Sequence, residues 1–396
     1  MKNATPCLVS AAAGCGAVLH ASRYVIAIAW LATSLIASGA SVRESFDIAV
    51  LQPPTPVTVE GKKQLVYELH LTNFSGDRLR LLTLKVVDSD HDAVLAAFAG
   101  PALVNRTRVL GLPVEAGKSD SSYIAPGQQA ILYVEFECRP SHVPRILSHS
   151  VEYSVSNEST SFVVSGGRTI VDPIPAIDLG PPLAGGDWAA VHHPDWPRGH
   201  RRVMYAVDGR ARIPGRFAID FIKVNDKGQT ANGDADTVLN SLGYGTPVLA
   251  VAHAKVVAVR HDVTESKQVS ENPKHSIEDA AGNYIVLRIA ERRFVFYEHL
   301  KPGSIRVRVG EDVRPGQVIA NLGFTGDSTG PHLHFHVADG LTPLGAEGLP
   351  FTFSRFTLHG HYAEIRDLGS AKPEALKGES ATRFNEMPSA NAVVSF

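Results

Sequence analysis

Histidines at alternate positions form the densest concentration of reactive side chains in the sequence. The segment Gly326–His336 (GDSTGPHLHFH) places His332, His334 and His336 after a turn-rich run of Gly, Ser, Thr and Pro. On a β-strand alternate side chains point to one face, so the three imidazoles are expected to lie side by side. Neutral imidazoles gathered in this way suit zinc, which prefers nitrogen and sulfur ligands in tetrahedral sites. The pattern therefore favours a metal site over three unrelated histidines.

Two further stretches supply candidate partners for these histidines. Asp220 is a lone carboxylate in the apolar segment Phe217–Phe221, where burial without a partner costs several kcal/mol. Its charge needs a cation, which is either a metal ion or a neighbouring arginine, Arg212 or Arg216. His299 ends a predicted strand just before a Lys-Pro-Gly turn, a position where a solvated histidine is also common.

The segment Leu322–Phe335 resembles the signature of the M23 (LytM/lysostaphin-type) zinc metallopeptidase family. Other landmarks of that family occur in the same order along the chain, at Gly245–Val248 with Ala250, Gly282–Tyr284, Tyr297 with His299–Leu300, and Val309–Gln317. The resemblance covers residues 200–345, approximately. It implies a β-sheet fold with a groove and one Zn²⁺ ion.

The resemblance also implies roles for four residues. Asp220 and His334 match metal ligands, and His299 and His332 match the two histidines that flank the metal. The implied reaction is peptide hydrolysis, because zinc lowers the pKa of its bound water toward ~7 and polarises the scissile carbonyl. One imidazole takes the proton of the water, and another stabilises the tetrahedral oxyanion.

The sequence departs from the family at the first metal ligand. The family motif is His-x-x-x-Asp, and here Arg216 stands in the His position; the family also usually has an acidic residue where His336 stands. A guanidinium stays protonated and cannot donate a lone pair to zinc. Three interpretations remain open. Either His336 or His200 completes the metal site, or the domain is a degenerate, non-catalytic M23 domain that binds cell wall or activates another wall hydrolase, or Arg216 forms a purely structural ion pair with Asp220.

Length and composition indicate a two-domain globular protein. The chain has 396 residues, of which 44% are hydrophobic and 20% are charged. The formal net charge is −2 and there is no basic run, which argues against a nucleic-acid partner.

Alternating hydrophobicity predicts a mostly β chain. Period-two patterning from 45 to 170 predicts an immunoglobulin-like antiparallel β-sandwich, in which Cys138 is a small core residue. The Pro- and Gly-rich residues 172–186 predict a semi-rigid linker. Residues 187–368 are expected to form the M23-type antiparallel β-sheet domain with a metal groove. Polar composition predicts a mostly disordered tail over 369–396, with Val393–Phe396 as a candidate edge strand.

The N-terminal residues 1–40 have the layout of a secretory signal. Arg23 precedes the apolar run Tyr24–Ile36, and the small residues Ser38–Ala40 follow. The segment predicts either a cleaved signal peptide or an uncleaved membrane anchor, and in both cases an exported protein, periplasmic or secreted. The sequence thus predicts an exported zinc metalloendopeptidase acting on stem or crossbridge peptides of peptidoglycan. A further hypothesis is that the sandwich is the functional part and docks a carbohydrate or a protein.

Overall fold

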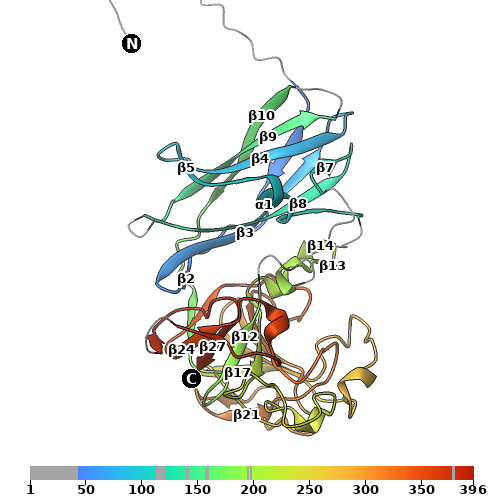
Figure 1. The fold of residues 1–396 in the computed structure, drawn as a ribbon, viewed down its shortest axis with the longest axis vertical. Coiled ribbons are helices and arrows are strands. Elements are labelled where there is room, and N and C mark those ends of the chain that lie inside the picture. Colours follow the sequence, from blue (N-terminus) through green and yellow to red (C-terminus); the bar gives the residue numbers. More distant parts are fainter. Residues whose placement is uncertain are drawn as a thin grey trace, which may run out of the picture. The chain divides into compact units, whose positions relative to one another are not determined.

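The computed structural model describes residues 43–112, 121–139, 142–156, 160–193, 196, 199–376 and 380–396. The predicted signal peptide or anchor lies outside these residues and stays a prediction. Within the described residues, no helix combines the length and the apolar character that crossing a membrane requires. β-strands make up most of the regular secondary structure of the described residues (Figure 1), in agreement with the predicted mostly β class.

The N-terminal part is a β-sandwich of two antiparallel sheets. One sheet contains β1 (Phe46–Ala49), β2 (Val57–Val59), β3 (Lys62–Asn73), β6 (Thr107–Val109) and β8 (Gln129–Glu137). The other contains β4 (Leu79–Asp88), β5 (Ala93–Ala99), β7 (Tyr123–Ile124), β9 (Ile146–Val155) and β10 (Ser161–Ile170). A short helix, α1 (Gly100–Val104), follows β5.

The core of the sandwich comes from the alternating positions that the sequence pattern indicated. Leu65, Leu69 and Leu132 are fully buried in one cluster with residues of the opposite sheet, such as Val151. The thiol of Cys138 is buried in the same cluster and forms no disulfide. The sandwich is therefore observed, while its immunoglobulin-like topology stays a prediction.

The C-terminal part is built on an eleven-stranded antiparallel sheet. Its strands, in spatial order, are β20 (Asp312–Val313), β17 (Ala254–Arg260), β18 (Tyr284–Ala290), β19 (Arg293–Glu298), β22 (Leu333–Ala338), β15 (Ile219–Lys223), β12 (Trp188–Val191), β27 (Ala392–Ser395), β24 (Phe356–His361) and β25 (Glu374–Ala375), with β26 (Ala381–Arg383) also paired to β24. Two-stranded pairings join β11 (Ile177–Leu179) to β23 (Phe351–Phe353), β13 (Tyr205–Val207) to β14 (Arg210–Arg212), and β16 (Pro247–Leu249) to β21 (Val318–Asn321). Short 3-10 helices are η1 (His200–Arg202), η2 (Pro214–Phe217), η3 (Val238–Asn240), η4 (Val269–Glu271) and η5 (Ile365–Asp367).

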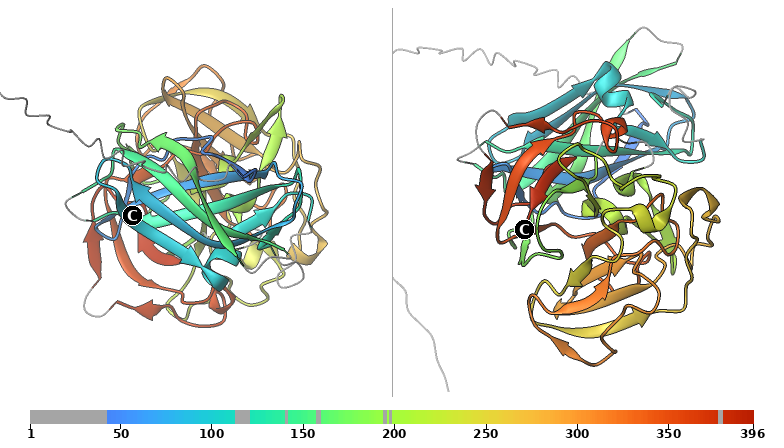
Figure 2. Two further views of the ribbon diagram at one scale, coloured as in Figure 1. Left: turned by 90° about the horizontal axis from the view of Figure 1, so that it is seen from above. Right: turned by 60° about the horizontal axis from the view of Figure 1, so that its bottom comes forward.

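The C-terminal residues complete this sheet, so the prediction of a mostly disordered tail was wrong. β27 pairs with both β12 and β24 and therefore lies inside the sheet, not at its edge (Figures 1 and 2). Ala392 and Val394 are fully buried among the core residues of the domain. A segment of four residues, three of them apolar, sufficed for a buried strand because two partner strands supply its hydrogen bonds.

The Pro- and Gly-rich residues 172–186, predicted as a semi-rigid linker, make strand and core contacts in the structure. β11 pairs in parallel with β23, and Leu179 and Leu183 are buried in the C-terminal core. That core also takes in Val57 and Val66 from the sandwich strands β2 and β3. Residues Glu44–Phe396 accordingly form one compact unit, in which the sandwich packs against the C-terminal domain.

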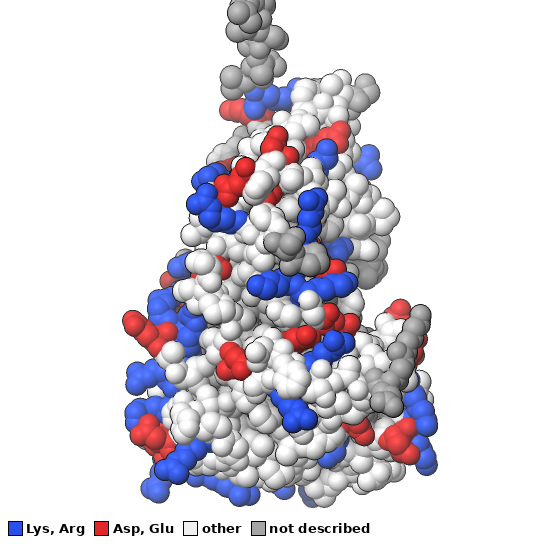
Figure 3. All heavy atoms as spheres, turned by 90° about the vertical axis from the view of Figure 1, so that its left-hand side faces the viewer, with Lys and Arg blue, Asp and Glu red and all other residues white. Residues whose placement is uncertain are grey.

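Charged side chains are interspersed on the face drawn in Figure 3, where neither sign dominates a large area. This distribution agrees with the near-zero net charge of the sequence.

Candidate metal centre

Two strands of the C-terminal sheet bring Asp220 and His334 together. Asp220 on β15 is the register partner of His334 on β22, and the imidazole Nδ1 lies 2.8 Å from the carboxylate Oδ1. Directly opposed residues of an antiparallel pair have their Cβ atoms close enough for short side chains to meet. The sheet alone therefore fixes this pair, as the family resemblance implied.

His200 approaches the same carboxylate from outside the sheet. It is the first residue of η1, and its Nε2 lies 2.8 Å from Oδ2 of Asp220. The His200 and His334 rings meet edge to face, with centroids 4.6 Å apart. Of the two candidate substitute ligands, His200 is the one that the structure places against Asp220.

Arg216 points away from this cluster. Its guanidinium is buried and lies 2.8 Å from the Glu68 carboxylate of β3 and 3.0 Å from that of Glu347. It also donates a hydrogen bond to the carbonyl oxygen of Gly348. The hypothesis of a structural Arg216–Asp220 ion pair was therefore wrong, because two other carboxylates hold the arginine.

His299 and His332 face each other beside Asp220, with ring centroids 4.7 Å apart. Nδ1 of His299 donates to the carbonyl oxygen of Thr325 at 2.7 Å, and Nδ1 of His332 donates to that of Gly330 at 2.7 Å. With Nδ1 occupied, each ring presents Nε2 as its free nitrogen. Nε2 of His332 lies 3.4 Å from Oδ1 of Asp220.

The backbone at His299 is in the left-handed region, with φ of 60°. Such a conformation is uncommon for a residue with a side chain and is concentrated at functional sites. Close approach of two loops holds it there. A Cβ atom on Gly282 would lie 2.4 Å from the Thr325 carbonyl oxygen, and one on Gly326 would lie 2.5 Å from that of Ala280. Glycine at both positions thus lets the Thr325 carbonyl reach His299.

A second buried layer lies behind His334. Its Nε2 is 3.1 Å from Nδ1 of His336, whose ring stacks on Phe296 with centroids 4.4 Å apart. The carboxyl of Glu298, the register partner of His334 on β19, lies 4.0 Å from both histidines. Sequence reasoning gave Glu298 no role, although a carboxyl at the end of the apolar strand Arg293–Glu298 was a usable signal. His336 therefore backs His334 and does not face Asp220.

Burial and the Asp220 charge together set the protonation of the cluster. Burial raises the pKa of Asp220, but the imidazoles of His200 and His332 outweigh it and hold that pKa well below its usual value. Burial lowers the pKa of His334 to about 4, helped by His200. Burial and the charge of Asp220 raise the pKa of Glu298 to about 8, so this carboxyl is mostly neutral at pH 7.

The two facing histidines are shifted in opposite directions. Burial and the neighbouring imidazoles lower the pKa of His299 well below its usual value. Burial also acts to lower the pKa of His332, but the charge of Asp220 outweighs it and raises that pKa. In this arrangement His299 is neutral at pH 7, while His332 is the more easily protonated of the pair.

The donor set fits a divalent transition metal. Ligand atoms of His200, Asp220 and His334 lie within 4.8 Å of one another. Two imidazole nitrogens and one carboxylate oxygen, with a coordination position left open, are typical of catalytic zinc sites. The close partners of the Asp220 carboxylate are imidazoles, which a metal ion would keep neutral and direct toward itself.

A cavity of about 600 Å³ opens onto this cluster. His200, Asp220, His299 and His332 line it together with apolar side chains such as Ile222. An apolar cleft with a few convergent polar groups is the usual form of a substrate site.

Residues 237–345 match the family model of peptidase family M23. An uncharacterized metalloprotease of Haemophilus influenzae is 35% identical over 120 residues, which are 30% of this chain and 22% of that protein. Peptidoglycan DD-endopeptidase ShyC of Vibrio cholerae is 42% identical over 133 residues, which are 33% of this chain and 28% of ShyC. The matched regions thus cover less than a third of these relatives. The crystal structure of a zinc-containing peptidase from Vibrio cholerae matches 78% of this chain and 86% of its own chain, with 17% identity and a TM-score of 0.23.

Proposed function

We propose that this chain, whose residues 237–345 match the model of peptidase family M23, is a zinc-dependent endopeptidase that cleaves peptide bonds in bacterial cell-wall peptidoglycan. One observation carries the catalytic part of the proposal. His200, Asp220 and His334 form one group of possible metal ligands, and His299 and His332 form a second group with the same His334. The substrate class is supported by the peptidoglycan endopeptidases among the relatives.

The residues of this chain divide into ligands and flanking groups. His200, Asp220 and His334 would hold the metal. A zinc ion bound there lowers the pKa of a coordinated water toward ~7 and polarises a carbonyl group. Of the flanking pair, a neutral imidazole accepts a proton from the attacking water. A protonated one donates a hydrogen bond to the oxyanion that develops on the scissile carbonyl.

The cleft supports a peptide substrate. Its apolar side chains exclude water around the reacting bond, and its open side leaves room for an extended chain. Work on peptidoglycan requires export, so this proposal includes the predicted signal or anchor over residues 1–40.

Hydrolysis of purified sacculi tests the proposal. The full chain, stripped with a chelator and reloaded with zinc, is expected to release soluble muropeptides that mass spectrometry identifies. The substitution His334→Ala removes a ligand fixed by the sheet and is expected to reduce release to the level of buffer alone. His253→Ala is the matched control, because His253 is an exposed residue between β16 and β17.

Two results would contradict the proposal. One is equal release by the chelated and the zinc-loaded protein. The other is a zinc-loaded protein that binds the metal through His334 and yet cleaves neither sacculi nor isolated muropeptides.

A further inference from the structure

The three residues of η1 point in two directions. His200 reaches Asp220, while Arg201 and Arg202 are buried against the sandwich. We propose that the sandwich positions His200 for metal binding through Arg201 and its partner Glu135. This inference rests on the proposed function, since it concerns the same metal centre. It makes Arg201 and Glu135 positioning residues, which act on the metal through His200.

Arg201 is the main connection between η1 and the sandwich. Its guanidinium lies 2.6 Å from the carboxylate of Glu135 on β8 and donates to the carbonyl oxygen of Val134 at 2.7 Å. It is also 3.6 Å from the carboxylate of Glu68 on β3. Charge-assisted hydrogen bonds of this kind are about twice as strong as neutral ones. The residue next to His200 is therefore fixed to two strands of the sandwich.

Arg202 adds a second set of contacts. Its guanidinium lies 4.3 Å from the centre of the Tyr133 ring and donates to the carbonyl oxygen of Asn105. Its own carbonyl oxygen accepts a hydrogen bond from Arg108 at 2.6 Å. The side chain and the backbone of Arg202 thus both contact residues of the sandwich.

The neighbouring helix η2 fixes the backbone of His200 from the other side. A Cβ atom on Gly215 would lie 2.7 Å from the Cβ of His200, so the two residues are in direct contact. Arg216, the next residue, shares Glu68 with Arg201. One buried carboxylate of the sandwich thereby anchors both helices.

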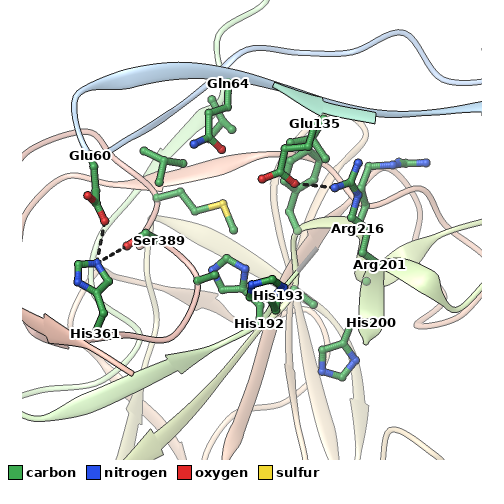
Figure 4. Close-up of a pocket in the computed structure, with 18 of the residues that line it drawn as sticks. Glu60, Gln64, Glu135, His192, His193, His200, Arg201, Arg216, His361 and Ser389 are labelled. Carbon is green, nitrogen blue, oxygen red and sulfur yellow. Dashed lines mark hydrogen bonds and ion pairs between the residues drawn. The ribbon is translucent and has the colours of Figure 1, made fainter. Parts of the chain in front are cut away.

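The C-terminal sheet offers His200 much less support. Asp220 and His334 are held by strand register, but η1 is a single turn, with the backbone bonds Arg202 N to Gly199 O and Val203 N to His200 O. η1 also borders a cavity of about 460 Å³ that His200, Arg201 and Glu135 help to line; Figure 4 shows Arg201 beside Glu135, with the His200 ring farther away. With this space on one side of η1, His200 is held by its contact with η2 and by the ion pair and hydrogen bond that join Arg201 to the sandwich.

Zinc affinity measures this positioning directly. The full-length protein is titrated with zinc against a chromophoric chelator, comparing wild type with Arg201→Ala and Glu135→Gln. Loss of a group that orients a metal ligand typically weakens metal binding 10–100-fold, and a loss of about that size is expected for both variants. Glu137→Gln is the matched control, because Glu137 lies two residues along the same strand and pairs with the exposed Lys62. Its affinity is expected to equal that of wild type.

A spectroscopic signature separates positioning from general damage. In the Co²⁺-substituted protein, loss of the His200 nitrogen changes the visible d–d bands, and Arg201→Ala and Glu135→Gln are expected to give the spectrum of His200→Ala. Thermal unfolding of the metal-free proteins checks the fold. Glu135→Gln is isosteric and its side chain is 27% exposed, so it serves if Arg201→Ala fails to fold.

The outcomes distinguish the inference from the proposed function. If His200→Ala binds zinc as tightly as wild type, the ligand set of the proposed function fails. If His200→Ala is weak while folded Glu135→Gln retains wild-type affinity and spectrum, only the positioning by the sandwich is refuted. Weakening of Glu137→Gln to the same extent as Glu135→Gln would also overturn it, since the effect would then not pass through η1.

Discussion

Replacing Arg216 by methionine tests whether this arginine is a structural ion-pair partner. Its side chain is only 4% exposed, and those of Glu68 and Glu347 are 3% and 7% exposed. Methionine fills a similar length without charge. Arg216→Met therefore leaves two buried carboxylates without their shared cation.

The expected loss follows from the cost of an uncompensated buried charge. Breaking a buried ion pair by removing one partner typically destabilises a protein by about 3–5 kcal/mol. At roughly 2 °C per kcal/mol for a domain of this size class, the midpoint of thermal unfolding falls by about 6–10 °C. Arg201, which lies 3.6 Å from Glu68, places the effect toward the lower end. In a double-mutant cycle, Glu68→Gln combined with Arg216→Met should cost less than the two single changes together.

The loss is expected to depend on pH. Burial raises the pKa of Glu68, but the charges of Arg216 and Arg201 outweigh it and hold the pKa below its usual value. A carboxyl with a depressed pKa stabilises the fold above its unfolded pKa of about 4.3, and this contribution is lost as the pH falls through the folded pKa. Without Arg216 the pKa of Glu68 rises. The stability gap between wild type and variant is therefore largest at pH 7 and narrows toward pH 4.

Urea unfolding monitored by circular dichroism at several pH values measures the gap. Arg145→Met is a suitable control, because Arg145 pairs with Asp90 at an exposed position. A variant as stable as wild type at pH 7, or a gap that widens on acidification, would refute this account of Arg216.

Four further changes probe other parts of the structure. Gly215→Ala should weaken zinc binding about 10-fold or more, because the new methyl group displaces His200 from Asp220. Competition with a chelator measures the affinity. An unchanged affinity would show that Gly215 does not confine His200. Burial lowers the pKa of His149 to about 4. The free energy of unfolding of wild type should therefore fall by up to about 3 kcal/mol more than that of His149→Gln between pH 7 and pH 4. Parallel curves of unfolding free energy against pH for the two proteins would contradict this. Burial raises the pKa of Cys138 to about 11. Alkylation of this thiol at pH 8 should therefore be at least about 100-fold slower in native than in urea-unfolded protein. Equal alkylation rates would refute the burial of Cys138. Removing β27 should prevent folding, because β12 and β24 each lose a buried partner strand. The expected result is loss of the β-sheet circular dichroism signal. A cooperative unfolding transition like that of wild type would show the strand to be dispensable.

The sequence determined the parts of the site that depend on local periodicity. Alternation over Leu333–Ala338 placed His334 and His336 on one strand, and an isolated carboxylate in an apolar strand marked Asp220. The family resemblance implied that Asp220 and His334 act together, and the register of β15 against β22 is what brings them together. The mostly β class followed from the same period-two pattern.

Only the tertiary structure decided which residue stands third beside Asp220 and His334. A motif of fixed spacing indicated position 216, yet Arg216 is held by Glu68, which lies 148 residues away in the sequence. His200 arrives in its place because the sandwich holds η1, and no short-range pattern encodes a contact between segments so far apart. The burial of β27 has the same origin, since this four-residue segment becomes a strand when β12 and β24 flank it. The sequence thus predicts which side chains share one face of a strand. The long-range ion pairs that position His200 form only once the two domains have packed.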